Sequence, residues 1–193
     1  MWGGVRITTP AAELPLTAAE LRARLRIDDD AQDTLLGDYL AAAAAAIEGP
    51  NGAGVAMMAQ TWTLTRAGFA RDMILPGWPV SALTAITYLD TEGAEQSLDL
   101  ATYRLANGLD PARLILAPGA SLPATLAGPG TVAIQYSLGC ASAAAVDPGL
   151  VTALALLAGH YFENREAAAP GTMGEIPLGV SHILARFARG CQS

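Results

Sequence analysis

One stretch, residues 147–166, constrains the fold of this chain more than any other. Its sequence, DPGLVTALALLAGHYFENRE, carries apolar residues at helical spacing along its length, which predicts a single long helix. The apolar stripe consists of Val146, Leu150, Val151, Leu154, Leu157, Ala158, Tyr161 and Phe162, and Ala153, Ala155 and Leu156 widen it. A helix of about twenty residues is roughly 30 Å long, and this one needs protein contacts on nearly all sides. We therefore expect a second subunit to supply part of the cover.

The composition predicts one soluble domain spanning residues 1–193. This length is sufficient for one sizeable core and short for two independent domains. The two cysteines form no C-x-x-C pair, which favours reduced thiols in a cytoplasmic setting. Residues 1–10 do not resemble a signal peptide, and the longest apolar runs are shorter than the roughly twenty residues of a membrane span. We expect no membrane association.

The charge pattern argues against a surface that holds DNA. All eleven basic residues are arginine, the net charge is −7, and acidic residues outnumber arginine in each third of the chain. A protein that binds DNA by neutralising phosphates needs a clustered basic patch, and no stretch of this sequence provides one.

The order of patterns predicts an α+β fold. Residues 1–58 hold the N-terminal helices, and residues 140–193 hold the long helix and a docking segment whose apolar residues recur at helical spacing over 178–189. Residues 59–139 change to a period of two, with short strands separated by turn signals. We expect the terminal helices to form a helical body, with a central small antiparallel β-sheet or barrel-like insertion.

Local signals place the first two helices. Thr17 and Glu20 form a capping box at the start of the first helix. The second is expected over residues 32–48, after a run of three aspartates in which Asp30 is the predicted N-cap.

The sequence carries no catalytic constellation. His160 and His182 lie on different predicted helices and lack further ligands at zinc spacing, while Ser181 and His182 are adjacent and point to different faces of a helix. The glycine-rich loop 49–54 lacks the Lys-Ser/Thr pair of a phosphate-binding loop, and the aspartates at 28–30 lack the other ligands of a calcium loop. We predict no catalytic, cofactor-binding or metal-binding residue, and hence an assembly protein rather than an enzyme.

Several segments resemble one protein family in the order in which they occur along the chain. They are LTAAELRARLRIDDD at 16–30, QTW at 60–62, LPGWPVSALTAITYLDTEG at 75–93, GHYFENREA at 159–167 and EIPLGVSHIL at 175–184. The chain is similar in these segments to the head-tail connector, or adaptor, proteins of long-tailed bacteriophages and gene transfer agents. The HYFENRE and PLGV pair is the most specific part of the resemblance.

The resemblance implies a structural protein of the particle neck, assembled in the bacterial cytoplasm. Such a protein forms a ring with itself, with twelve subunits as the expected number, beneath the capsid portal protein. It joins the portal to a stopper or tail-completion protein, and DNA passes through the central channel without sequence-specific binding. No cofactor is implied.

The helix and the resemblance together give a set of candidate interface residues. They are Leu154, Leu157, Tyr161, Phe162, Glu163, Asn164, Arg165, Pro177, Leu178, Gly179 and Arg186. Two alternatives remain open at this point: a soluble adaptor that binds an unrelated protein partner, and an enzyme or nucleotide-dependent packaging factor that uses the glycine-rich loop.

Overall fold

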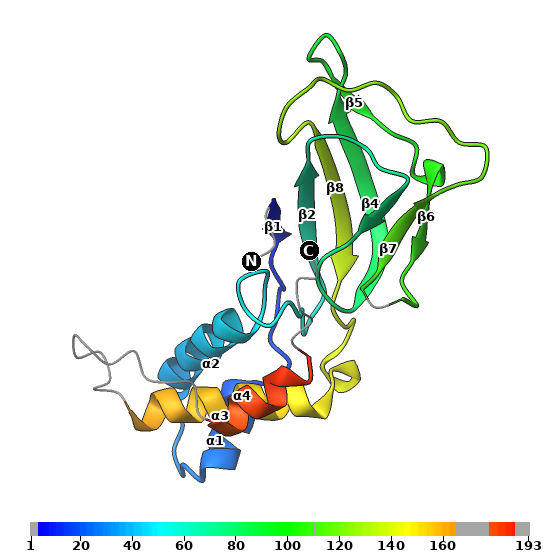
Figure 1. Cartoon of the computed structure of the whole chain (residues 1–193). Helices are drawn as coiled ribbons and strands as arrows, with labels where there is room; N and C mark the ends of the chain where they lie inside the picture. The colour runs from blue at the N-terminus through cyan, green and yellow to red at the C-terminus, as the bar shows by residue number, and fades with distance from the viewer. Residues whose placement is uncertain (1–3, 110, 165–177, 188–193) are drawn as a thin grey trace. The chain divides into compact units, whose positions relative to one another are not determined.

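Strands and helices separate into two units in the computed structural model, which describes residues 4–109, 111–164 and 178–187 (Figure 1). Of the described residues, the β unit comprises 4–12, 59–109 and 111–139, and the helical unit comprises 13–58, 140–164 and 178–187. The predicted mixture of helices and antiparallel sheet is confirmed, and neither of the two sheets in the described residues closes into a barrel.

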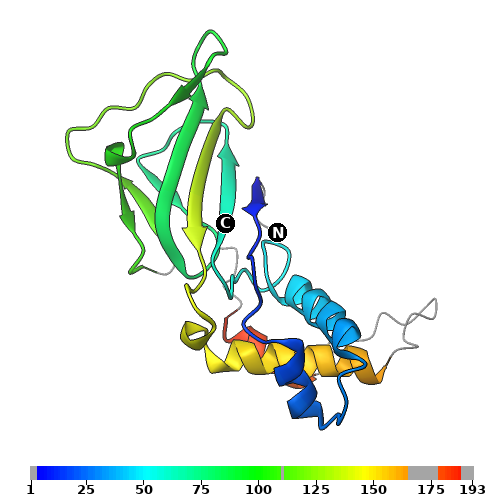
Figure 2. The same ribbon diagram turned by 180° about the vertical axis from the view of Figure 1, so that it is seen from behind.

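The β unit contains a five-stranded and a three-stranded sheet, and every strand pair is antiparallel (Figure 2). The larger sheet has the order β1 (Val5–Thr9), β2 (Gln60–Arg66), β8 (Val132–Leu138), β4 (Val80–Leu89) and β5 (Glu95–Ser97). The smaller has the order β3 (Asp72–Ile74), β7 (Arg113–Leu116) and β6 (Tyr103–Ala106), and a short 3-10 helix, η1 (Leu100–Thr102), leads into β6. Neighbouring strands are therefore often distant in sequence.

The core of the β unit is organised around two aromatic residues on the central strands. Trp62 of β2 lies directly opposite Tyr136 of β8, and neither side chain is accessible to solvent. The polar atom of each has a partner: Trp62 Nε1 donates to Gln60 Oε1 at 2.8 Å, and the Tyr136 hydroxyl donates to the Pro76 carbonyl at 2.7 Å. Burial raises the pKa of Tyr136 above its usual value. The donors of both rings are therefore satisfied within the core.

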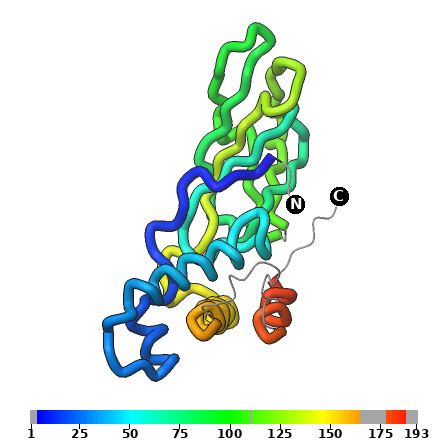
Figure 3. The backbone as a smooth tube through the Cα atoms, turned by 90° about the vertical axis from the view of Figure 1, so that its left-hand side faces the viewer, coloured from blue at the N-terminus to red at the C-terminus, as the bar shows by residue number. Residues whose placement is uncertain are grey.

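The helical unit contains α1 (Ala18–Leu25), α2 (Asp33–Ile47), α3 (Pro148–Glu163) and α4 (Leu178–Ala185), with a 3-10 turn, η2 (Ala143–Ala145), before α3. The long helix contacts each of the other three, and Figure 3 shows α3 and α4 side by side. Its buried residues are Leu150, Ala153, Leu154, Leu157, Ala158 and Gly159. Gly159 allows a close approach, since a Cβ there would lie 3.2 Å from Leu25 of α1.

The predicted cap of α1 is confirmed, whereas the predicted cap of α2 is wrong. Glu20 N–H donates to Thr17 Oγ1, and Thr17 N–H donates in return to Glu20 Oε2 at 2.8 Å, which lowers the pKa of Glu20. Helix α2 begins at Asp33, within one residue of the expected start, but Gln32 and not Asp30 occupies its N-cap position. The physical reason is local, because Asp29 Oδ1 accepts the Ala31 N–H and holds the preceding residues in a turn.

No helix in the described ranges combines the length and the apolar character that crossing a bilayer requires.

Gly77, in the turn before β4, is predicted to tolerate no side chain. It has φ +93°, and an added Cβ would lie 2.6 Å from Leu138 Cδ1 and 2.7 Å from Trp62 Cζ3. We expect Gly77→Ala to lower the free energy of unfolding by about 2–4 kcal/mol, through backbone strain and core overpacking together. Urea denaturation measures this change.

Gly93 provides the matched control. It has φ +85°, but an added Cβ there would meet no atom within 4 Å, so Gly93→Ala should cost only the backbone strain of about 1–2 kcal/mol. Equal losses for the two variants would show that the approach of Gly77 to Trp62 and Leu138 contributes nothing.

Candidate assembly surfaces

Three aromatic rings meet where the end of α3 passes α2, and we call this group the aromatic corner. Tyr39 of α2 packs against Phe162 edge-on, with ring centroids 6.4 Å apart, and against Tyr161 at 6.5 Å. All three side chains are half-buried. Edge-to-face pairs of this kind add about 0.5–1.5 kcal/mol beyond the area that they bury. The corner thus joins two helices while leaving aromatic surface exposed.

His160 contacts the C-cap residue of α3, Asn164. The Asn164 amide donates to the His160 carbonyl at 2.9 Å and lies 3.1 Å from His160 Nδ1. This pair satisfies one of the carbonyl groups that a helix end leaves without an intrahelical partner. His160 therefore has a structural role at the helix terminus.

The candidate interface residues fall into three groups. Leu154 and Leu157 are fully buried within the helical unit, so their contribution to any assembly acts through folding. Exposed or half-buried are Tyr161, Phe162, Glu163, Asn164, Leu178, Gly179 and Arg186. Arg165 and Pro177 lie outside the described residues. Leu178 is 89% exposed, and the Arg186 guanidinium lies over the Phe187 ring, 5.8 Å from its centroid.

Other exposed apolar side chains lie outside the set of candidate interface residues. Leu156 is 49% exposed in the middle of α3, and the β unit exposes Ile7, Ile74, Leu109 and Leu126. For Leu156, the helical position could have given the signal, because it lies on the same face as the polar Thr152. For the β-unit residues, exposure depends on which strands pair, and that information is non-local.

The described ranges contain no group of three or more His, Cys, Asp or Glu side chains that could hold a metal ion. Partial burial raises the pKa of Cys140, and its thiol donates to the Ala145 carbonyl at 3.3 Å, which disfavours a reactive thiolate.

Backbone N–H groups of the glycine-rich loop 49–54 donate to carbonyl groups of the same region. The N–H groups of Gly49 and Gly54 donate to the Val55 and Gly49 carbonyls, and Ala53 N–H donates to the Ile47 carbonyl. A Cβ at Gly52 would lie 2.5 Å from backbone oxygens of the preceding helix. The glycines thus permit a tight turn and do not present free N–H groups to a phosphate, which removes the basis for a nucleotide-dependent function.

The family model and the solved structures that match this chain all belong to phage connectors or to gene transfer agent (GTA) particles. The model of the phage gp6-like head-tail connector protein family matches residues 16–60. A chain in the neck of an empty GTA particle, computed with C6 symmetry, superposes with a TM-score of 0.76 at 31% identity, covering 96% of this chain and 95% of that chain. A chain in the neck of a native GTA particle, computed with C12 symmetry, gives 0.74 at 28% identity over the same shares.

A third structure, the virion of a native gene transfer agent particle, gives a TM-score of 0.73 at 30% identity, again over 96% and 95% of the two chains. A search of curated proteins finds no match.

The fold, the exposed apolar and aromatic surfaces and these relatives define a structural assembly protein and not an enzyme. The chain belongs to the head-tail connector family of bacteriophages and gene transfer agents, and it is a structural connector of the head-tail junction.

Adjacent leucines on α3 test which part of the helix belongs to the core. Leu157 is 1% exposed, so Leu157→Asp should lower the free energy of unfolding by about 3–5 kcal/mol, because it buries an unpaired carboxylate. Leu156 is 49% exposed, so Leu156→Asp should change it by about 1 kcal/mol or less. Chemical denaturation of both variants measures the difference. If Leu156→Asp proved as destabilising as Leu157→Asp, the outer face of α3 would have to be buried within the monomer.

Proposed function

We propose that the chain forms a closed ring beneath the capsid portal protein and joins it to the next connector or tail component. The observation that carries this proposal is the match over nearly the full chain, at 31% identity, to a chain in a neck structure computed with C6 symmetry, together with a second match in a neck computed with C12 symmetry. Twelve copies are compatible with both symmetries. The ring assembles in the bacterial cytoplasm and becomes part of the particle neck.

Residues 1–193 act as one assembly unit in this proposal, with the terminal helices forming the helical body of the ring. A ring needs a heterologous contact, in which one surface of each copy binds a different surface of the next. We assign the aromatic corner, Glu163, Asn164 and the exposed start of α4 at Leu178 and Gly179 to contacts with a neighbouring copy or the portal. Half-buried aromatic side chains suit this role, because aromatic residues are enriched in interfaces.

DNA passes through the ring without being held. The net charge of −7 supports this part of the proposal, since a channel that bound phosphates tightly would impede DNA movement. The stopper or tail-completion protein binds on the side away from the portal.

Electron microscopy of the purified chain, alone and mixed with its portal protein, tests the ring. We expect closed rings in at least one of the two samples. A folded monomer that neither closes into rings nor binds the portal would contradict the proposal. A defined complex with a host protein in the absence of capsid proteins would instead favour a soluble adaptor.

Phe162→Ala is expected to weaken assembly more than folding. The ring of Phe162 is half-buried, so its removal should lower the free energy of unfolding by only about 1–2 kcal/mol, whereas the yield of rings or portal complexes should fall several-fold. Phe69→Ala is the matched control, because Phe69 is also half-buried and also packs edge-on against a tyrosine, Tyr88, at 5.4 Å. If the two variants assemble equally well, Phe162 belongs to the monomer and not to the interface.

A further inference from the structure

We propose that neighbouring copies in the ring also contact each other through their β units. The outer face of the three-stranded sheet of one copy docks on the β4–β5 hairpin of the next copy. This inference rests on the ring proposed above and names one of its subunit contacts.

The outer face follows from the strand register. Asp72, Ile115 and Arg104 lie opposite one another in one row, and Ile74, Arg113 and Ala106 form the next row on the same face. The alternate residues, among them Met73, Leu114 and Tyr103, point to the other face and are buried. The six side chains of the two rows therefore form the solvent side of the sheet.

This outer face combines apolar surface with arginine. On this face Ile74 is 39% exposed, and Ile115 is half-buried. The Arg113 guanidinium makes two contacts of 2.8 Å with the Asp72 carboxylate, through Nε and Nη2, so this pair holds its geometry on the face. Arg104 is exposed and makes no ion pair within the described residues. Exposed apolar residues beside arginine are typical of protein interfaces.

The β4–β5 hairpin, whose turn spans residues 90–94, carries the opposite charge on a loop held by hydrogen bonds to Asp90. Asp90 accepts hydrogen bonds from Gln96 Nε2 and from the N–H groups of Ala94 and Glu92, each at 3.0 Å, and these bonds lower the pKa of Asp90. The carboxylates of Glu92 and Glu95 are exposed beside it.

Leu126 adds an apolar side chain at the same end of β4. Its N–H donates to the Leu89 carbonyl at 3.0 Å, and its side chain is 37% exposed. Each of the two surfaces thus offers an apolar contact and charges of one predominant sign.

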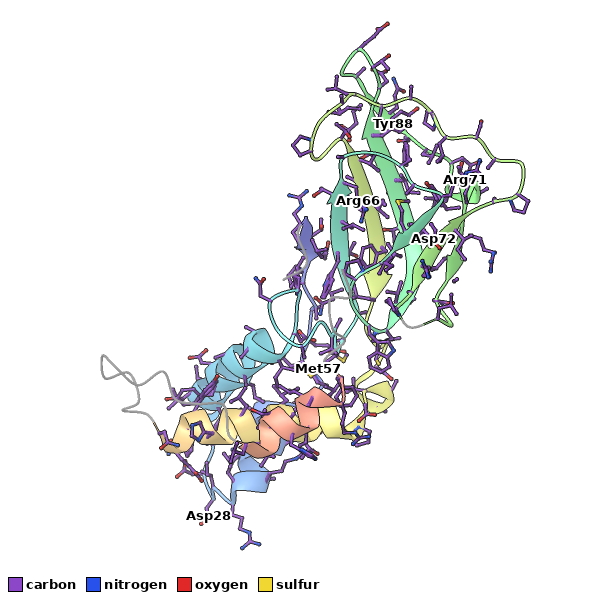
Figure 4. The ribbon with its side chains drawn as sticks, in the orientation of Figure 1. Asp28, Met57, Arg66, Arg71, Asp72 and Tyr88 are labelled. Atoms are coloured by element: carbon purple, nitrogen blue, oxygen red, sulfur yellow. The ribbon has the colours of Figure 1, made fainter. Side chains whose placement is uncertain are left out.

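Charge and placement together identify a second copy as the occupant. The outer face carries two arginines and one aspartate, whereas the hairpin carries three carboxylates, so the two surfaces are complementary. The two surfaces lie at different levels of the β unit, as the positions of Asp72 on the outer face and Tyr88 beside the hairpin show in Figure 4. The outer face of one copy therefore does not contact the hairpin of the same copy. A contact between two different surfaces of identical chains is the heterologous kind that a ring requires.

Charge reversal tests this contact with the full-length chain. We would prepare Arg104→Glu on the outer face, and Glu92→Arg with Glu95→Arg on the hairpin. Arg66→Glu is the matched control, because Arg66 is an exposed arginine at the end of β2, outside the proposed contact. Sedimentation and electron microscopy, with and without portal, give the fraction of chain in rings, and thermal melting confirms that each variant is folded.

We expect each charge-reversed variant alone to form at least tenfold fewer rings than the Arg66→Glu control. An equimolar mixture of the two variants should restore assembly. In a ring in which the two variants alternate, the acidic outer face of the Arg104→Glu copy meets the basic hairpin of the other variant at one interface. At the next interface the unaltered outer face meets an unaltered hairpin. Raising the salt concentration should weaken wild-type rings, because exposed charges are screened.

Two outcomes would overturn the contact. Arg104→Glu could form rings as well as Arg66→Glu, or the mixture could stay as defective as its components although both are folded. In either case wild-type rings would still support the proposed function. Failure of the wild-type chain to form rings or bind the portal would overturn the proposed function instead.

Discussion

Helix α3 can be stable in water only while other helices cover it. Its buried residues form the longest apolar surface of the helical unit, and α1, α2 and α4 each contact it. Burial of a single leucine stabilises a fold by about 1.5–3 kcal/mol, so Leu150, Leu154 and Leu157 alone contribute a large share of a typical net stability. The other three helices are amphipathic pieces that would be marginal in isolation.

The elements that could be predicted from sequence are those with local causes. The capping box of α1 and the apolar stripe of α3 depend on residues three or four positions apart, and both were placed within a few residues. Strand β1 could not be identified from its own residues, because its identity depends on pairing with β2, more than fifty residues away. Thr63 lies in the segment whose period of two predicts strands, but the period does not reveal that Thr63 is buried, with its hydroxyl hydrogen-bonded to that of Thr8 on β1. Sheet order is non-local in the same way.

The candidate surfaces also differ in whether their causes are local in sequence. The aromatic corner could be predicted in part, since Tyr161 and Phe162 lie in a conspicuous segment at the end of a helix, but their partner Tyr39 could not. The outer face of the three-stranded sheet was missed entirely. Ile74, Arg104 and Arg113 are far apart in the chain, and only the register of three short strands places them on one surface. That the chain forms a single domain remains a prediction.

Charge gives a physical reason why the proposed ring would use two kinds of contact. Copies that each carry a net charge of −7 repel one another when they are brought together. Apolar and aromatic contacts supply attraction but little selectivity, because many apolar surfaces fit one another. An arginine face that meets a carboxylate hairpin reduces the repulsion where the copies meet and penalises wrong pairings, which bring like charges together. The same excess of carboxylates keeps the remaining surface unfavourable for DNA phosphates. In the proposed ring, the acidic composition would serve both subunit selection and the free passage of DNA, with Arg104 and Arg113 on the face that a neighbour binds.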